Sequence, residues 1–362
     1  MQIDARVEAW ASLQLVPGAS PRALFALLKA FGGPTEVLTA SRASLARVVS
    51  AELAAAIEHG PDPAALDRAL AWLRQPGHAL IAWDDSAYPQ ALLSVADPPP
   101  VLYFRGRQEL LNRPSLAIVG SRNATPQGID TAESFATALS AAGLTIVSGL
   151  ALGIDAAAHR GGLAGAGSSL AVLGTGIDRV YPTANRTLAQ RLVEAGGILS
   201  EFPIRTPPLP ANFPRRNRVI SGVSRAVLVV EATLASGSLI TARFAAEQGR
   251  DVLAIPGSIH SPFSKGSHRL IKDGAKLVET AGDVLEELGM QAASGAIAAP
   301  ASVASEGNAE RVLAALGHDP AGVDALCERS GLPAHVVCVV LVQLELEGRI
   351  ANIPGGLYQR LR

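Results

Sequence analysis

The sequence is poor in the residues and patterns that define several common protein classes. It contains only two cysteines in 362 residues, and their positions near the C-terminus, Cys327 and Cys338, fit neither a disulfide framework nor a zinc site. We interpret both as small buried hydrophobic residues. No apolar run approaches about 18 residues, and the chain does not start with a basic segment followed by an apolar core. We therefore expect a cytoplasmic protein without membrane contact.

An excess of charge of one sign is also missing. The formal net charge is -1, so a polyanion has to be met by a local basic patch, since the whole molecule gives no attraction. Apolar residues make up 48% of the chain and charged residues 17%, which is typical of a globular protein. No Walker lysine motif occurs, so the sequence gives no support for nucleoside triphosphate hydrolysis.

Four short apolar runs organise the middle of the chain. They cover residues 115–119, 144–147, 170–173 and 226–230. Each run is apolar throughout and does not alternate with polar residues, which is typical of strands covered on both faces. Because helix-like segments separate the runs, we predict an α/β fold with an extended Rossmann-like, doubly wound parallel sheet.

Each of the first three runs ends in a turn rich in glycine and polar residues. Because the carboxyl ends of parallel strands line one crevice, we expect these turns to converge. Glycines let a ligand approach the backbone, and the helix after each turn offers free N–H groups and the positive end of its dipole. We therefore predict an anionic ligand, with Arg122 as the fixed cation of the turns. The turn residues assigned to the site are Ser121, Arg122, Asn123, Ser148, Gly149, Gly174, Thr175 and Gly176.

The stretch 213–218 is the most cation-dense part of the chain. Its three arginines gain nothing from the dipole of a helix that starts there. They are explained by a polyanion that crosses this surface, or by pairing with Glu201 and Glu231 at nearby strand ends, and both explanations stay open. A hydroxyl-rich turn follows after residue 231, and three of the four lysines fall between 265 and 276. The candidates from these stretches are Arg215, Arg216, Asn217, Arg218, Ser236 and Lys265.

Two patterns suggest enzymes, and we favour neither. Ser148, Asp155 and His159 lie within twelve residues, but no nucleophile-elbow pattern surrounds the serine. We interpret Asp155 as a cap and His159 as packed beneath the loop. The run from Gly174 begins like a dinucleotide fingerprint but has Arg179 where the third glycine would stand. We expect no catalytic residue, no metal and no cofactor.

The segments on either side of the sheet region differ from it in composition. Residues 1–75 predict a domain of short helices, in which a Pro-Gly turn resembles a helix-hairpin-helix. Residues 76–288 form the predicted central domain, and 77–106 read as an arm packed on it. Residues 289–308, rich in Ala, Ser and Gly, predict a flexible linker. Residues 309–362 predict a winged helix, whose almost uncharged third helix favours packing or protein contact over DNA reading.

Several motifs occur in a specific order between about residues 80 and 285. They include Gly120-Ser-Arg, Ser148-Gly-Leu-Ala, Gly174-Thr-Gly, Phe213-Pro-Arg-Arg-Asn-Arg and Leu270-Ile-Lys-Asp-Gly-Ala. This series resembles the DNA-processing protein A family (DprA, also called Smf). The resemblance implies a protein that binds and protects incoming single-stranded DNA and loads the RecA recombinase during natural transformation. It also implies a non-catalytic Rossmann-like core that forms a homodimer, with SAM-like helical and winged-helix modules at its ends.

The resemblance assigns roles to particular residues. It places Arg122 on a phosphate, the turns at 148–149 and 174–176 on the pocket, and 215–218 on a flanking basic surface. Leu152 departs from the family pattern, because many members have Arg or Lys there.

Two other functions remain as alternatives. One is a Rossmann-type nucleoside-monophosphate phosphoribohydrolase that uses Glu231 or Glu201, although the Gly-Gly-x-Gly-Thr phosphate turn of such enzymes is absent after Pro256. The other is a transcriptional regulator that works through residues 310–362.

Overall fold

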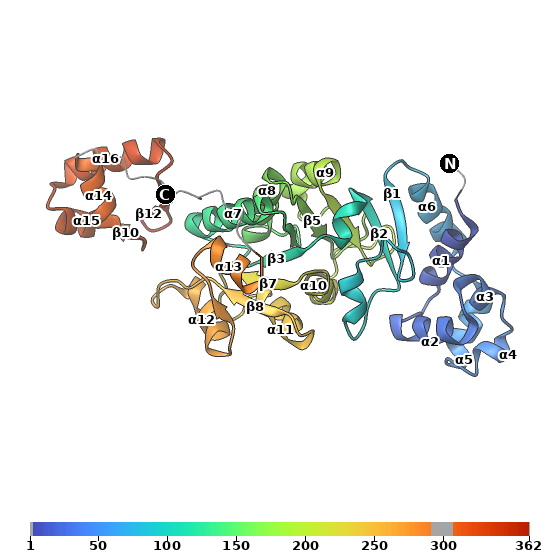
Figure 1. Ribbon diagram of the computed structural model, residues 1–362. Helices are drawn as coiled ribbons and strands as arrows, with labels where there is room; N and C mark the ends of the chain where they lie inside the picture. Colours follow the sequence, from blue (N-terminus) through green and yellow to red (C-terminus); the bar gives the residue numbers. More distant parts are fainter. Residues whose placement is uncertain (1–2, 291–306, 362) are drawn as a thin grey trace.

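The computed structural model describes residues 3–290 and 307–361, and most of the predicted linker at 289–308 lies outside these residues. A group of helices lies at one end of the molecule, a large α/β unit in the middle and a small helical unit at the other end (Figure 1). Within the described residues, the central unit contains one sheet of nine strands in the order β1-β2-β6-β5-β4-β3-β7-β8-β9.

Seven neighbouring strands of this sheet are parallel. They are β3 (Ser115–Val119), β4 (Thr145–Ser148), β5 (Ser169–Val172), β6 (Gly197–Ser200), β7 (Ala226–Val229), β8 (Asp251–Ala254) and β9 (Lys276–Leu277). The predicted parallel sheet is confirmed. The interpretation of 77–106 as an arm is wrong, because β1 (His78–Ala82) and β2 (Val101–Gly106) extend the sheet as antiparallel strands next to β6.

Alternate residues of the strands point to two helical layers, which explains why the runs are apolar throughout. Leu116 and Ile118 of β3 pack with α7 (Pro126–Ala141), α8 (Ile154–Ala164) and α13 (Ala281–Glu287). Ala117 and Val119 pack on the opposite side with α10 (Asn212–Val223) and α11 (Ser238–Glu247). Two further helices, α9 (Arg186–Ala195) and α12 (Lys265–Lys272), complete the unit.

The order of the strands reverses at β3. From β3 the chain proceeds through β4, β5 and β6 toward one edge, whereas β7, β8 and β9 lie on the other side of β3. In open α/β sheets the crevice outside the carboxyl ends of two such strands is the usual place of a ligand. The ends of β3 and β7 therefore mark the position where a site is expected.

Six helices precede the sheet and dock against its antiparallel edge. They are α1 (Ala5–Leu15), α2 (Pro21–Phe31), α3 (Pro34–Thr39), α4 (Arg42–Leu45), α5 (Ala51–His59) and α6 (Pro63–Leu73). Arg6 forms ion pairs with Asp84 and Asp85, and the rings of Phe25 and Trp83 meet edge to face at 5.5 Å. These contacts hold the helical unit against the segment that follows β1.

The C-terminal unit has three helices and a small sheet around its own apolar core. Its elements are α14 (Asn308–Leu316), β10 (Ala321–Gly322), α15 (Val323–Ser330), α16 (Ala334–Leu346), β11 (Ile350–Ile353) and β12 (Leu357–Arg360), in agreement with the predicted winged helix. The free Cys338 is exposed and Cys327 half-buried, so the expectation that both are buried is wrong. None of the described helices is by itself long and apolar enough to span a membrane. Only α15 and α16 taken together, with a bend of 108° between them, have the length and composition of such a span.

Candidate nucleic-acid interface

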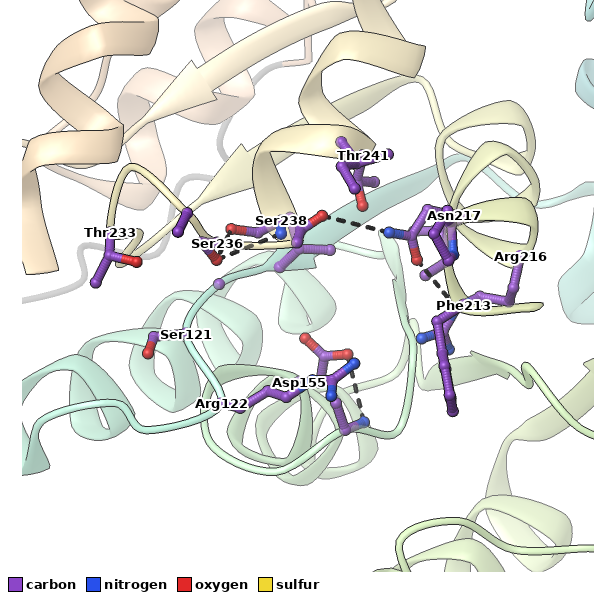
Figure 2. A pocket seen from close by; sticks show the side chains of 18 of the residues that line it. Ser121, Arg122, Asp155, Phe213, Arg216, Asn217, Thr233, Ser236, Ser238 and Thr241 are labelled. Atoms are coloured by element: carbon purple, nitrogen blue, oxygen red, sulfur yellow. Dashed lines mark hydrogen bonds between the residues drawn. The ribbon is translucent and has the colours of Figure 1, made fainter. Parts of the chain in front are cut away.

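A cavity of about 700 Å³ opens at the point where the strand order reverses. Three segments enclose it: the turn after β3, the segment 233–241 that leads into α11, and the first half of α10 (Figure 2). Of the residues predicted from the sequence, the cavity brings together Ser121, Arg122, Asn123, Arg216, Asn217 and Ser236. We call this cavity the switch-point pocket.

Arg122 is the exposed cation of this pocket. Its guanidinium lies over the ring of Phe213, 5.5 Å from the ring centroid. The ring of Tyr181, which is exposed, lies 5.7 Å from that of Phe213. A planar cation beside two accessible rings can hold a phosphate and stack a base at the same time.

Hydroxyl groups form the opposite wall of the pocket. The hydroxyls of Ser236 and Ser238 are 2.7 Å apart, and Ser236 Oγ accepts a hydrogen bond from the backbone N–H of Ser238 at 3.3 Å. Thr233 and Thr241 extend this wall (Figure 2). The first N–H groups of α11 are engaged with Ser236 and Gly237, so the helix adds the positive end of its dipole to a site suited to an anion.

A buried charge pair forms the floor. Nη1 of Arg216 donates hydrogen bonds to the carbonyl oxygens of Gly149, at 2.5 Å, and Val172. Oδ2 of Asp155 accepts from the backbone N–H groups of Gly149 and Ala151 at 3.1 and 3.4 Å. Burial lowers the pKa of Arg216 to about 10, so it stays charged at neutral pH, and burial raises the pKa of Asp155 against the effect of Arg216. The pair holds the 149–151 turn in place.

The packing interpretation of His159 is confirmed. Its Nε2 accepts a hydrogen bond from the backbone N–H of Leu150 at 3.2 Å, and its Nδ1 lies 2.8 Å from Oγ of Ser169. Burial, followed by the charge of Arg216, lowers the pKa of His159 to about 3, which keeps the ring neutral. The hydroxyl of Ser148 is buried and donates to the carbonyl oxygen of Ile118 at 2.7 Å. Ser148 and His159 therefore stabilise the loop through hydrogen bonds and do not form a catalytic triad.

The second glycine turn reaches the pocket through Ala151, but its predicted residues Ser148 and Gly149 do not line the pocket, and neither does the third turn, 174–176. A Cβ at Gly174 would stand 2.9 Å from Cδ1 of Phe213, and one at Gly149 would overlap the guanidinium of Arg216. The expectation that all three turns line one open crevice therefore holds for the first turn and for Ala151 of the second, and is wrong for the third. Gly174 lies beneath Phe213 and Gly149 beneath Arg216, and the other predicted residues of these turns are buried: Ser148, Thr175 and Gly176.

The arginines of α10 do not form the exposed basic surface expected from the sequence. Arg218 is buried and pairs with the carboxylate of Glu201, and Arg215 reaches the same oxygen at 3.1 Å. The side chain of Arg215 is 48% exposed, so it is the only one of the three that faces solvent to a large extent. Pairing with Glu201 thus accounts for Arg215 and Arg218, and hydrogen bonds to carbonyl groups account for Arg216.

Glu231 and Lys265 also lie outside the switch-point pocket. The carboxylate of Glu231 accepts hydrogen bonds from the backbone N–H and the hydroxyl of Thr125, at 3.0 and 2.7 Å, and burial raises its pKa. Nζ of Lys265 donates to the carbonyl oxygen of Ile259 and borders a different cavity.

Sequence reasoning missed several lining residues. Phe213, Tyr181, Thr233, Ser238 and Thr241 were not among the candidates, although all five line the pocket. The aromatic residue directly before the arginine-rich stretch was the available signal, because rings beside cations are typical of surfaces that bind single strands.

The fold and the pocket define a class of protein: a Rossmann-like unit with an anion-suited pocket at the reversal of its strand order, joined to a winged helix. The family described as DNA recombination-mediator protein A matches residues 79–289, and the DprA winged helix domain matches residues 296–356. The chain belongs to the DprA family, whose members are also called Smf.

Known relatives and structures agree with this assignment. Protein Smf of Escherichia coli is 45% identical over 304 residues, which cover 82% of this chain and 81% of that protein. The crystal structure of DprA from Streptococcus pneumoniae superposes with a TM-score of 0.69 at 36% identity, over 79% of this chain and 99% of that one. DprA from Helicobacter pylori, described for its single-stranded DNA binding mode, gives a TM-score of 0.53 at 30% identity, over 58% and 95% of the two chains.

Proposed function

We propose that this protein binds single-stranded DNA in the switch-point pocket and acts in DNA processing during natural transformation. The observation that supports this most is the arrangement of Arg122 and the α11 hydroxyls around an open cavity that also presents Phe213 and Tyr181. Cation and hydroxyls suit a phosphate, and the rings suit an unstacked base. The binding mode described for the H. pylori relative agrees with this choice of ligand.

Binding to single-stranded and double-stranded oligonucleotides of the same length provides the first test. We expect at least a tenfold preference for the single strand, because a base inside a duplex cannot stack on Phe213 or Tyr181. If about three phosphates are neutralised, log K should fall with log salt concentration at a slope of about -2. Fluorescence anisotropy at two salt concentrations measures both quantities. Equal affinity for the two forms would contradict the proposal.

The resemblance to the DprA family supports two further parts of the proposal. We infer that the bound strand is protected, and that the protein loads the RecA recombinase onto it in the cytoplasm without a catalytic step of its own. The phosphoribohydrolase alternative is less well supported. Its candidate carboxylates, Glu201 and Glu231, are bonded to Arg218 and Thr125 and do not line the pocket.

A homodimer through the central unit is a separate part of the proposal. Leu234, Ile259 and Leu277 are 66%, 67% and 43% exposed and border one cavity beside α12. Large apolar residues grouped on one surface mark interaction sites, and a second copy of the chain is the partner we propose. We expect the double variant Leu234→Asp, Ile259→Asp to be monomeric by light scattering. The control Leu93→Asp, at another exposed leucine, should remain dimeric; a dimeric double variant would exclude this surface.

The winged helix contributes little DNA affinity in this proposal. Among the exposed residues of α16 are Val339, Val342 and Leu346, and residues 334–347 contain neither Arg nor Lys. A helix that reads DNA needs such side chains on its exposed face. We therefore expect a protein ending at residue 306 to bind a single-stranded oligonucleotide within about threefold of the full chain, since phosphate contacts dominate affinity. Loss of binding would favour the transcriptional regulator.

The division of the chain into parts belongs to the same proposal. We assign 1–75 to a SAM-like helical domain, 76–288 to the DNA-binding domain, 289–308 to a linker and 309–362 to the winged helix. The separate apolar core of the last part supports its independence, whereas the core of the N-terminal helices continues into the sheet.

A further inference from the structure

Another cavity lies between the sheet and the N-terminal helices. Its volume is about 600 Å³, and α6, the end of β2, the segment 177–180 and α9 supply its walls. We define it by Trp72, Arg105, Asp178, Arg186 and Gln190 and call it the arginine groove.

One loop separates the arginine groove from the switch-point pocket. Val180 lines the groove, and the next residue, Tyr181, lines the pocket. The loop is tied to the pocket floor, because Nδ2 of Asn185 donates hydrogen bonds to the carbonyl oxygens of Leu150 and Ala151 at 2.9 and 3.0 Å. A strand that leaves the pocket past Tyr181 therefore meets the groove next.

The groove carries cations that the protein itself does not neutralise. Arg105 and Arg186 line the groove with exposed side chains, and neither has an ion-pair partner among residues 3–290 and 307–361. Other surface arginines of the central unit, such as Arg160 and Arg243, are paired with carboxylates. Unpaired arginines grouped on a polar surface attract and hold a polyanion.

Two carboxylates also line the groove, Asp178 and Glu194. Oδ1 of Asp178 accepts a hydrogen bond from the backbone N–H of Arg205 at 2.8 Å. Glu194 lies on α9, two turns after Arg186. Two arginines and two carboxylates thus line the groove, and two further exposed arginines adjoin it: Arg179, next to Asp178 in the chain, and Arg205, whose backbone contacts Asp178. Among these residues, cations outnumber carboxylates.

We propose that the arginine groove is a second contact for the same single strand, holding the phosphates of the segment that leaves the switch-point pocket past Tyr181. The inference rests on the proposed function and extends the site toward the N-terminal helices. Trp72 of α6, stacked on His78 at 4.0 Å, forms one wall, so the helical domain becomes part of the DNA path.

Oligonucleotide length separates the two contacts. The variant Arg105→Ala, Arg186→Ala should bind an oligonucleotide of about 20 nucleotides about tenfold more weakly, with a salt slope reduced by about 1.4, because two phosphate contacts are lost. Its affinity for about 5 nucleotides, which fill only the pocket, should stay within twofold. The control Arg47→Ala, Arg191→Ala removes the same charge from exposed arginines outside both cavities, one of them on α9, and should change neither affinity.

The outcomes are distinct. A groove variant that loses affinity for both lengths equally, or for neither, overturns the inference and leaves the switch-point pocket as the site. Failure of the unaltered protein to bind either length overturns the proposed function and this inference with it.

Crosslinking gives a second measurement that does not depend on affinity. Gln190 and Thr187 are both exposed on α9, but only Gln190 lines the groove. A photoreactive p-benzoylphenylalanine at position 190 should crosslink to the 20-nucleotide strand, whereas the same group at position 187 should not. Equal crosslinking from both positions would contradict a defined path through the groove.

Discussion

Replacing Glu201 by alanine is expected to lower the free energy of unfolding by about 3 kcal/mol, because the buried guanidinium of Arg218 then keeps only the carbonyl oxygen and the more distant carboxylate of Asp97. The side chains of Glu201 and Arg218 are only 2% and 9% exposed, so water cannot replace the lost carboxylate. The change also frees Arg215 and disturbs the contact between Gln14 and the backbone of residue 201. Urea unfolding of the purified variant, followed by circular dichroism, measures the loss.

Two controls make this prediction specific. Glu133→Ala breaks an ion pair with Arg160 whose side chains are 41% and 37% exposed, and should cost at most about 1 kcal/mol. The double variant Glu201→Leu, Arg218→Met removes both charges and should recover much of the stability, because apolar residues of similar volume tolerate burial. If Glu201→Ala unfolds like Glu133→Ala, the buried pair does not stabilise the end of β6.

Arg122→Ala should weaken the binding of single-stranded DNA by about 1.5–3 kcal/mol, roughly 10- to 150-fold, the range for a charged hydrogen-bond partner. Arg122 is the only exposed cation among the described residues that line the switch-point pocket, and Arg216 beneath it is committed to carbonyl groups. Its exposed side chain forms no ion pair within the described ranges, so folding should be unaffected. Anisotropy titration and a thermal melt measure the two effects.

The matched substitutions identify what Arg122 provides. Arg47→Ala removes an exposed arginine from the N-terminal helices and should leave DNA affinity unchanged. Arg122→Lys keeps the charge but loses the planar guanidinium group. Its affinity for DNA should therefore lie between those of Arg122→Ala and Arg47→Ala. Unchanged affinity in Arg122→Ala would show that the pocket is not the phosphate site.

The fold could be predicted from the sequence to the extent that its signals are local. Helices cover both faces of the strand Ser115–Val119, so the side chains on both faces are apolar. This continuous apolar run can be seen in the sequence alone. The pairing of β2 with β6 is different, because it joins residues about 95 positions apart, such as Phe104 and Leu199, and no local pattern encodes it. The sequence therefore predicts for 77–106 only an arm packed on the central domain and not its place in the sheet.

Site residues that directly follow a strand could be predicted from the sequence. Residues whose side chains turn toward the protein interior could not. Arg122 and Ser236 follow β3 and β7, and the rule for parallel sheets places both at one rim. Charged residues are assumed to be exposed, yet Arg216 and Arg218 point inward because Gly149 and Glu201 offer acceptors there. Those acceptors are contributed by residues 67 and 17 positions away, so the orientation of α10 follows from tertiary contacts.

Both margins of the large sheet are protected from further strand addition. On one side β1 is packed against α1 and α6, and on the other β9 consists of two residues, one of which is a lysine engaged with Glu287. Open, flat strand margins recruit other chains through their free N–H and carbonyl groups, whereas short or lysine-bearing ones do not. Removal of the first 75 residues would uncover β1, so we expect the helices at the start of the chain also to protect the protein against aggregation through this strand.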